Sequence, residues 1–224
     1  MAEPIVLSVE AGISEQQLNE VIKLLGNKNA MKAAQGAVSD TVRTIKKRIA
    51  QEIGKAVNLK IGEIKDQMDA KMGSWREPRG SITITRRAIP LYKYLSGQMR
   101  VPRPAWRGTL RAKVRKRASG RYGGGSQPQP GKFVAHIQGQ QTAVFERTGV
   151  KRKATKGRYK GKMREAIRHV MGPTALGVFV HAAGEGAQTI LRGILDETGS
   201  LLAKNLLSQM ARPDLQPRSI GQPL

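Results

Sequence analysis

Hydrophobic residues recur every three or four positions over residues 30–57, a spacing that predicts one long amphipathic α-helix. We expect its apolar face to pack on a β-sheet rather than in a coiled coil, because Glu and Lys residues flanking the face pair poorly. A shorter helix is predicted before it, since Ser14 and Gln17 have the spacing of a capping box and Gly26 stands where a helix ends. The apolar face of the long helix consists of Met31, Ala34, Val38, Val42, Ile45, Ile49, Ile53 and Val57.

Two later segments also have helical spacing. Residues 184–210 predict a C-terminal helix that is interrupted at Gly199 and Ser200. A helix capped by Asn58 is predicted directly after the long one. The buried edge of that helix is expected to consist of Ile61, Ile64, Met68 and Met72.

The two ends of the chain are expected to behave as arms. Residues 5–9 suit either a short strand or an extended segment. Residues 211–224 contain three prolines. We expect residues 1–13 and 211–224 not to fold alone and to lie over neighbouring molecules.

Alternating and β-branched patterns predict strands in the middle of the chain. Residues 81–85 alternate strictly, and residues 110–115 alternate apolar with cationic side chains, which predicts a strand with one face of each kind. Two apolar runs, residues 133–137 and 143–147, are joined by a short connection containing Gly139, which predicts a β-hairpin. Residues 119–131 are rich in Gly, Ser, Gln and Pro, which predicts a flexible hairpin tip.

Helices at both ends and strands between them predict an α+β fold. We expect a small antiparallel sheet of three to four strands, packed by the long N-terminal helix, with a C-terminal helix and flexible arms. The expected organisation is an N-terminal arm and short helix over residues 1–29, a core domain over residues 30–183, and a C-terminal helix with its Pro-rich tail over residues 184–224.

Composition changes this picture mainly through charge. The chain has 40 Lys and Arg against 16 Asp and Glu, a formal net charge of +24, so it favours a polyanion or an acidic neighbour. It contains no cysteine, which excludes disulfides and Cys-ligated zinc. The first residues lack the basic and apolar regions of a signal peptide, and no segment reaches the apolar length of a membrane span.

Few residues suggest catalysis or metal binding. His136 is expected to be half-buried in a strand, and Glu165 and His169 have the spacing of one helix face. A zinc site needs more ligands than this pair, so solvated side chains are the favoured interpretation. No nucleophile, paired carboxylates or phosphate-binding loop is recognisable. We therefore expect no enzyme activity, no catalytic residue, no cofactor and no metal.

Two clusters of cations are the strongest candidates for a binding function. Contact with DNA would be made to phosphates and would be insensitive to base sequence, because no base-reading motif adjoins either cluster. Contact with an acidic protein neighbour is the equal alternative. The long basic loop over residues 151–164 is expected to project, because it carries no apolar anchor before Met163. The candidate residues are Arg111, Lys113 and Arg115 in the first cluster and Lys151, Arg152, Lys153, Lys156, Arg158 and Lys160 in the second.

The order of motifs over residues 30–179 resembles the minor tail protein Z family of tailed bacteriophages. The family pattern is a strand, a Gly turn, a Val-Phe-x-Arg motif, a basic loop and a Gly-Pro-Ser/Thr motif. Segments 88–91 and 112–116 are also similar to the family. The residues that match the main pattern are Phe133, Gly139, Val144, Phe145, Arg147, Gly172, Pro173 and Thr174.

The resemblance implies a structural virion protein without catalytic activity. Such a protein is a tail completion protein at the head-proximal end of the tail, where it mediates tail assembly and head–tail joining. Its implied partners are further copies of itself in a ring, expected to be a hexamer, the tail terminator or tail tube, the head–tail connector and genomic DNA in the channel. It is implied to reside in the tail or neck of the virion after assembly in the host cytoplasm. The alternative is a free-standing, sequence-independent nucleic-acid-binding protein, which explains the charge but not the motif order.

Overall fold

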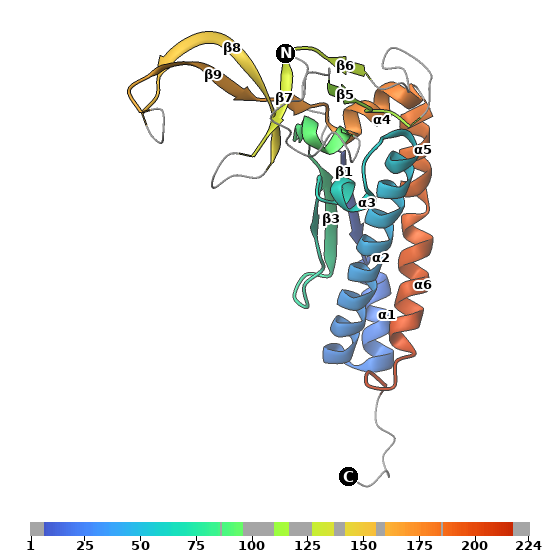
Figure 1. Cartoon of the computed structure of the whole chain (residues 1–224). Coiled ribbons are helices and arrows are strands. Elements are labelled where there is room, and N and C mark those ends of the chain that lie inside the picture. Colours follow the sequence, from blue (N-terminus) through green and yellow to red (C-terminus); the bar gives the residue numbers. More distant parts are fainter. Residues whose placement is uncertain are drawn as a thin grey trace. The chain divides into compact units, whose positions relative to one another are not determined.

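The computed structural model describes residues 7–85, 87–95, 110–116, 127–136, 142–155, 160–184 and 186–216. It confirms the α+β class (Figure 1). The helical elements are α1 (Glu15–Leu25), α2 (Asn27–Ala56), α3 (Ile61–Lys65), the 3-10 turn η1 (Leu91–Tyr94), α4 (Ala175–Ala183), α5 (Gly186–Asp196) and α6 (Thr198–Met210). The strands are β1 (Leu7–Gly12), β2 (Met68–Lys71), β3 (Arg79–Ile84), β4 (Ile89–Pro90), β5 (Leu110–Ala112), β6 (Gln127–Gln129), β7 (Lys132–Ala135), β8 (Ala143–Lys153), β9 (Met163–His169) and β10 (Met171–Gly172).

The chain forms two compact units, each built from segments that are distant in sequence. The first contains residues 1–53, 61–86 and 183–224, and the second contains residues 54–60 and 87–182. No helix in the described ranges has both the length and the apolar character needed to cross a membrane.

The capping box predicted before α1 is present. The Ser14 hydroxyl accepts a hydrogen bond from the Gln17 amide at 3.3 Å, and the Gln17 side chain accepts one from the Ser14 amide at 3.2 Å. Two of the amides that a helix start leaves unsatisfied are therefore bound. Gly26 ends the helix with a φ of +74°, a backbone conformation that glycine adopts without strain.

Helix α2 is the core of the first unit, and its predicted apolar face is buried except at Met31, which is only half-buried. Val38, Val42, Ile45, Ile49 and Ile53 are at most 1% exposed. The sheet β1-β3-β2 is antiparallel throughout, with β3 in its centre. A methyl group added at Gly80 of β3 would lie 2.7 Å from Val42 Cγ2, so the backbone of β3 rests directly on α2. The predicted packing of this helix on a sheet is confirmed.

The same helix is also covered by α6, which lies beside it (Figure 1). Asn205 Nδ2 donates to Thr41 Oγ1 at 2.9 Å, and Gln209 Nε2 donates to Asp40 Oδ2 at 2.8 Å. Thr41 is fully buried, and its hydroxyl in turn donates to the Ala37 carbonyl at 2.7 Å. The buried Thr41 hydroxyl thus both donates and accepts a hydrogen bond, as burial of a polar group requires.

The helix predicted over residues 58–72 is wrong in its second half, and Ile61 of its predicted buried edge is 44% exposed while Ile64 is buried. The described helix ends at Lys65, and Met68 is buried as the first residue of strand β2, while Met72 is 42% exposed. Asn58 does not cap α3. Its amide donates to the Val114 carbonyl and its side chain to the Lys113 carbonyl, both at 2.8 Å. Strand pairing with β3 outweighs the helical spacing of the methionines here.

The predicted arms fold against their own chain over much of their length. Residues 7–12 form β1, which pairs with β3 along its whole length. Leu215 is 4% exposed, and its carbonyl accepts a hydrogen bond from Asn29 Nδ2 at 3.0 Å. The C-terminal helix is interrupted at Glu197 rather than at Gly199 and Ser200. Residues 1–6 and 217–224 lie outside the described part of the chain.

The second unit is built around Tyr94, which is fully buried. Its hydroxyl donates to the Pro173 carbonyl at 2.9 Å, and a methyl group added at Gly172 would lie 2.9 Å from its ring. The next residue, Thr174, caps α4, because its hydroxyl accepts from the Gly177 amide at 3.0 Å. The Gly-Pro-Thr motif therefore has a structural role, and α4 is an element that the sequence did not predict.

The predicted hairpin tip over residues 119–131 contains a strand. Gln127–Gln129 form β6, which pairs antiparallel with β5. β5 itself confirms the strand predicted from residue 110, although it ends at Ala112. Pro128 is tolerated in β6 because it occupies an edge strand, where a missing amide donor costs little.

Replacing Gly80 by Ala tests the close approach of β3 to α2. The new methyl group would lie 2.7 Å from Val42 Cγ2 and 3.0 Å from the Lys71 carbonyl oxygen. We expect the free energy of unfolding to fall by about 1–3 kcal/mol in urea denaturation, as overpacking generally causes. Gly62→Ala is the matched control, since nothing lies within 4 Å of its added methyl group. It should leave stability unchanged or raise it by up to about 1 kcal/mol, and equal effects at both glycines would contradict the packing.

Candidate functional site

Strands β8 and β9 form a long curved ribbon in the second unit (Figure 1). β7 pairs with β8 only from Ala143 to Glu146, whereas β8 continues to Lys153 with β9 as its partner. Amide-to-carbonyl bonds between Ala154 and Lys162 and between Gly161 and Ala154 extend the ribbon at 2.9 and 2.8 Å. In the range of the predicted basic loop, residues 151–153 and 163–164 therefore belong to a two-stranded ribbon, and residues 156–159 lie outside the described part of the chain.

The base of the ribbon contains the predicted hairpin, which is confirmed. Phe133 lies opposite Phe145 with ring centroids 6.3 Å apart, and Phe145 lies opposite His169 at 5.7 Å. The Arg147 guanidinium is 5.6 Å from the centroid of the Phe133 ring, within the range of a cation–π contact. Among the resemblance residues, Phe133, Phe145 and Arg147 thus lie together. Gly139 and Ile137 fall outside the described ranges.

Hydrogen bonds tie this base to the rest of the second unit. Val170 follows β9, and its amide donates to the Val144 carbonyl at 2.9 Å. The Val170 carbonyl accepts from the Leu91 amide at 3.1 Å, beside the pairing of β10 with β4. These hydrogen bonds fix the base of the ribbon to the segment that contains β4 and β10. Gly172 and Pro173 belong to the same segment and contact Tyr94.

A β-bulge separates the base of the ribbon from its outer part. The register shifts between Arg147 and Lys151, and Gly149 has a φ of +74°. Glu165 holds the bulge from the opposite strand: its Oε1 accepts from the Gly149 amide at 2.8 Å, and its Oε2 lies 3.7 Å from Arg147 Nη1. Thr148 Oγ1 also donates to the Ala166 carbonyl at 3.0 Å. Bulges of this kind bend a ribbon and redirect its side chains.

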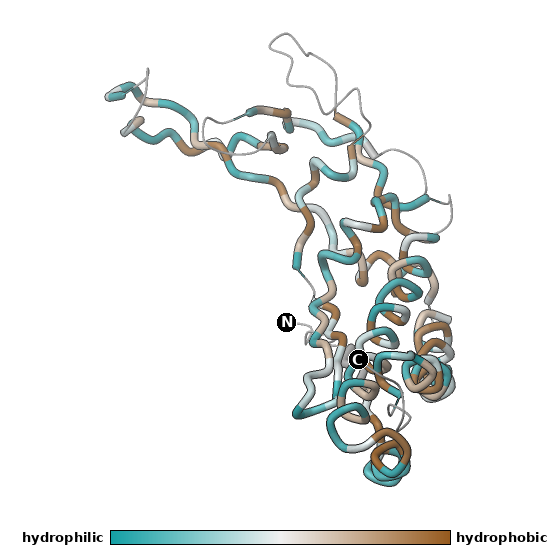
Figure 2. The backbone as a smooth tube through the Cα atoms, turned by 90° about the horizontal axis from the view of Figure 1, so that it is seen from below, coloured by the Kyte–Doolittle hydropathy of each residue, from teal (hydrophilic) through white to brown (hydrophobic). Residues whose placement is uncertain are grey.

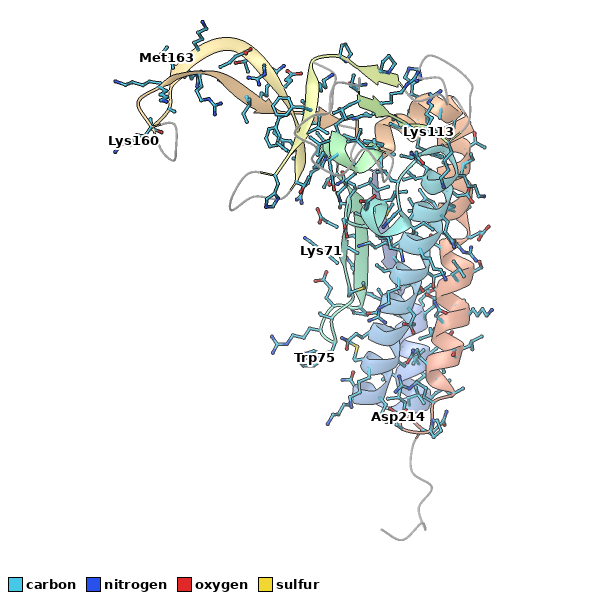
Figure 3. The ribbon with its side chains drawn as sticks, viewed as in Figure 1. Lys71, Trp75, Lys113, Lys160, Met163 and Asp214 are labelled. Carbon is cyan, nitrogen blue, oxygen red and sulfur yellow. The ribbon has the colours of Figure 1, made fainter. Side chains whose placement is uncertain are left out.

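The outer part of the ribbon is strongly cationic. Hydrophilic positions dominate it, interrupted by single hydrophobic residues (Figure 2), and Lys160 and Met163 lie near its end (Figure 3). Over the ranges that the structure describes, five exposed cations there have no carboxylate within 4 Å, and Arg164 adds a sixth positive charge. The five are Lys151, Arg152, Lys153, Lys160 and Lys162. Lys156 and Arg158 lie outside the described residues.

Large apolar side chains are exposed on the same ribbon. Val150 is 53% exposed, Met163 63% and Ile167 43%. An open hollow of about 540 Å³ lies along the ribbon and is lined by Phe133, Arg147, Lys153, Met163 and Ile167 among others. Contact with a partner would remove these exposed apolar side chains from water, which is favourable.

The other predicted cluster does not form one cationic face. Arg111 and Lys113 are exposed, but Arg115 is only 3% exposed and its Nη2 lies 3.3 Å from His181 Nδ1. The alternation fails because β5 ends at Ala112 and Arg115 pairs with Val57 through a single bridge, which turns its side chain inward. The expectation that Arg115 is a surface cation is therefore wrong.

The histidine environments differ from those expected. His136 follows β7, is exposed, and has its Nδ1 3.2 Å from Thr142 Oγ1. Glu165 and His169 lie on strand β9 rather than on a helix, and their contacts are with Gly149 and Arg147 and with Phe145, respectively. Within the described residues, no three His, Asp or Glu side chains are grouped in a way that would hold a metal ion.

Comparisons of this chain with protein-family models, curated proteins and solved structures gave no match. The order of motifs in the sequence and the physical chemistry of the ribbon are therefore the basis for assigning a function.

Replacing Glu165 by Ala tests its hold on the bulge. We expect the Gly149 amide to exchange its hydrogen roughly 5-fold faster, as the loss of one hydrogen bond worth about 1 kcal/mol implies. Glu165→Gln keeps an acceptor oxygen and should largely restore slow exchange. The hydrogen exchange is measured by NMR. If the Ala variant exchanges as slowly as the wild type, Glu165 does not fix the bulge.

Proposed function

We propose that this chain is a structural virion protein, a tail completion protein at the head-proximal end of a phage tail. It acts in tail assembly and in joining the tail to the head. The observation that carries this assignment is the outer part of the β8–β9 ribbon. Within the described chain, its strand edges are unpaired and its apolar side chains are exposed. The resemblance in motif order supports a place in the virion of a tailed phage, and the ribbon is the surface that would bind neighbouring molecules.

A two-stranded ribbon gains little stability in water by itself, because it has almost no apolar face to bury. Beyond Arg147 the ribbon has β8 and β9 alone, and in the described residues neither outer edge has a further strand. Free strand edges readily pair with or pack against other molecules. Val150, Met163 and Ile167 are exposed beside these edges, so docking would remove apolar surface from water. Segments of this kind suit assembly, where a partner completes them.

Charge supports the same function. A chain of net charge +24 repels further copies of itself at close range. We propose a homo-oligomeric ring, a hexamer, whose copies meet through heterologous contacts. Such a ring requires negative charge nearby, which DNA in the channel or acidic faces of the tail terminator, tail tube and head–tail connector would supply. Assembly occurs in the host cytoplasm, and the finished protein resides in the tail or neck region.

The second candidate is a sequence-independent nucleic-acid-binding protein that acts outside a virion. Five ribbon cations have no carboxylate within 4 Å among the residues that the structure describes, which favours this candidate directly. This candidate needs no ring and no neighbouring virion protein. The two candidates therefore differ in where the chain is found, not in the chemistry of the ribbon.

We expect purified particles of the phage that encodes this chain to contain it. Mass spectrometry should detect the chain, and averaged electron density should place a ring of it at the head-proximal end of the tail. A phage mutant that lacks the chain should produce heads and tails that fail to form infectious particles. Supplying the wild-type chain in trans should restore infectivity. Particles that are infectious without the chain would contradict the proposed function, and a single asymmetric copy of the chain at this position would contradict the ring.

A further inference from the structure

We infer that the outer part of the β8–β9 ribbon inserts into the major groove of double-stranded DNA and neutralises phosphates on both sides of it. Groove binding follows from the ribbon alone and goes beyond the proposed function, because a tail protein can join its neighbours without touching DNA. It also holds if the chain acts outside a virion.

The first reason is that the ribbon is cationic on both faces. Side chains alternate between the faces of a strand, so Lys151 and Lys153 share one face and Arg152 lies on the other. Arg164 is directly opposite Arg152 and shares its face. A flat acidic protein surface would neutralise only one face. The walls of a DNA groove present phosphates on two sides, which matches the distribution of charge.

The second reason is electrostatic strain across the ribbon. Like charges directly opposite one another destabilise a pair of strands, and Arg152 faces Arg164 in this way. Lys151 faces Glu165, but that carboxylate is bound to the Gly149 amide and to Arg147 instead. The ribbon's one carboxylate beyond Arg147 in the described ranges is thus committed to shaping the bulge. An external polyanion would offset the repulsion among Lys151, Arg152 and Lys153, which have no carboxylate within 4 Å in the described ranges.

The third reason is size. Paired strands lie about 4.7–4.9 Å apart, and the major groove of B-form DNA is about 12 Å wide and admits a two-stranded ribbon. The minor groove is about 6 Å wide, and the major groove of A-form RNA is too narrow for side chains to enter. Because no third strand flanks the outer ribbon in the described chain, the ribbon is narrow enough to enter the groove edge first, with one cationic face toward each phosphate backbone.

The side chains of the ribbon indicate binding that is insensitive to base sequence. Residues 142–155 and 160–169 contain no Asn, Gln or Asp, so the amide groups that read adenine are missing there. Lysines contact phosphates as point charges. Val150 and Met163 are exposed beside the cations and are suited to contact sugars, which carry no sequence information. Phosphate contacts position a protein on a duplex without selecting a sequence.

The test compares two variants that lose the same charge in different places. The ribbon variant replaces Lys151, Arg152, Lys153, Lys160 and Lys162 by Gln. The control variant replaces five exposed cations on helices of the first unit, Lys23, Lys28, Lys32, Lys47 and Arg192, by Gln. Thermal denaturation verifies that both are folded, which exposed positions allow. Affinity for a duplex of about 30 base pairs is measured by fluorescence anisotropy between about 50 and 200 mM salt.

If the five ribbon cations each contact a phosphate, the slope of log affinity against log salt falls by about 4–5 in the ribbon variant. At the lower salt concentration its affinity is expected to fall by on the order of 100-fold or more, and the control variant should stay within about 5-fold of the wild type. Equal losses in both variants would overturn the inference, because they would indicate general attraction to a basic protein.

Two further measurements identify the groove and the class of partner. The ribbon in the major groove should protect guanine N7 from dimethyl sulfate, and the minor-groove ligand netropsin should not displace the protein. Displacement by netropsin without N7 protection would overturn major-groove binding. Poly-glutamate at equal charge should compete much more weakly than duplex DNA. Equal competition would overturn the inference in favour of an acidic protein partner. DNA binding in solution and presence in virions are separate readouts, so either can fail without the other.

Discussion

The first unit depends on how closely the backbone of β3 approaches helix α2. Gly80 permits that approach, since a methyl group there would overlap Val42. The contact buries Val38 and Val42 of α2, and each fully buried side chain of this kind contributes about 1.5–3 kcal/mol. α6 then covers another side of the helix through Thr41 and Asn205. Strands β1 and β2 need β3 in this position because both pair with it.

Unlike the closely packed α2 and β3, the ribbon is stabilised by few contacts. Its base has the Phe133–Phe145–His169 ring contacts and the Val170 hydrogen bonds, but its outer part has cross-strand hydrogen bonds and the Glu165 anchor. Elements with little buried apolar surface open more easily than a core does. A stable support that carries an incompletely stabilised, charged ribbon is consistent with the proposed role in assembly, because a partner would complete what the chain leaves unsatisfied.

Local signals in the sequence predicted the elements whose stabilising contacts are also local. The Ser14–Gln17 capping box, the periodic face of α2 and the pairing of the apolar runs that contain Phe133 and Phe145 each appear as expected. The predictions failed where distant partners decide the structure. Met68 belongs to a strand because β3 pairs with it. Leu215 is buried, and its carbonyl accepts a hydrogen bond from Asn29 at the start of α2. No pattern within either segment reveals those partners.

The sequence predicted which cations belong to the candidate site but not the strands on which they lie. The cations over residues 151–164 were identified, whereas their arrangement on two paired strands was not, because a strand of alternating Lys and Arg lacks the apolar face that marks a strand in sequence. Glu165 gave no signal of its role, since its bond to Gly149 depends on the register of β9. Arg115 was misplaced because alternation ends where β5 does. Thr174 preceded a recognisable apolar run and could have been read as a helix cap.

Amide hydrogen exchange with and without duplex DNA tests most directly whether the outer ribbon is the surface that a partner completes. The measurement follows peptides that cover residues 150–155 and 160–164, which leave out the Gly149 amide held by Glu165, with peptides of α2 as an internal reference. Our account predicts fast exchange in the free chain, strong slowing of exchange in both ribbon segments on binding, and unchanged exchange in α2. Exchange in the ribbon that is already slow in the free chain, or that stays fast while the chain binds DNA, would contradict it.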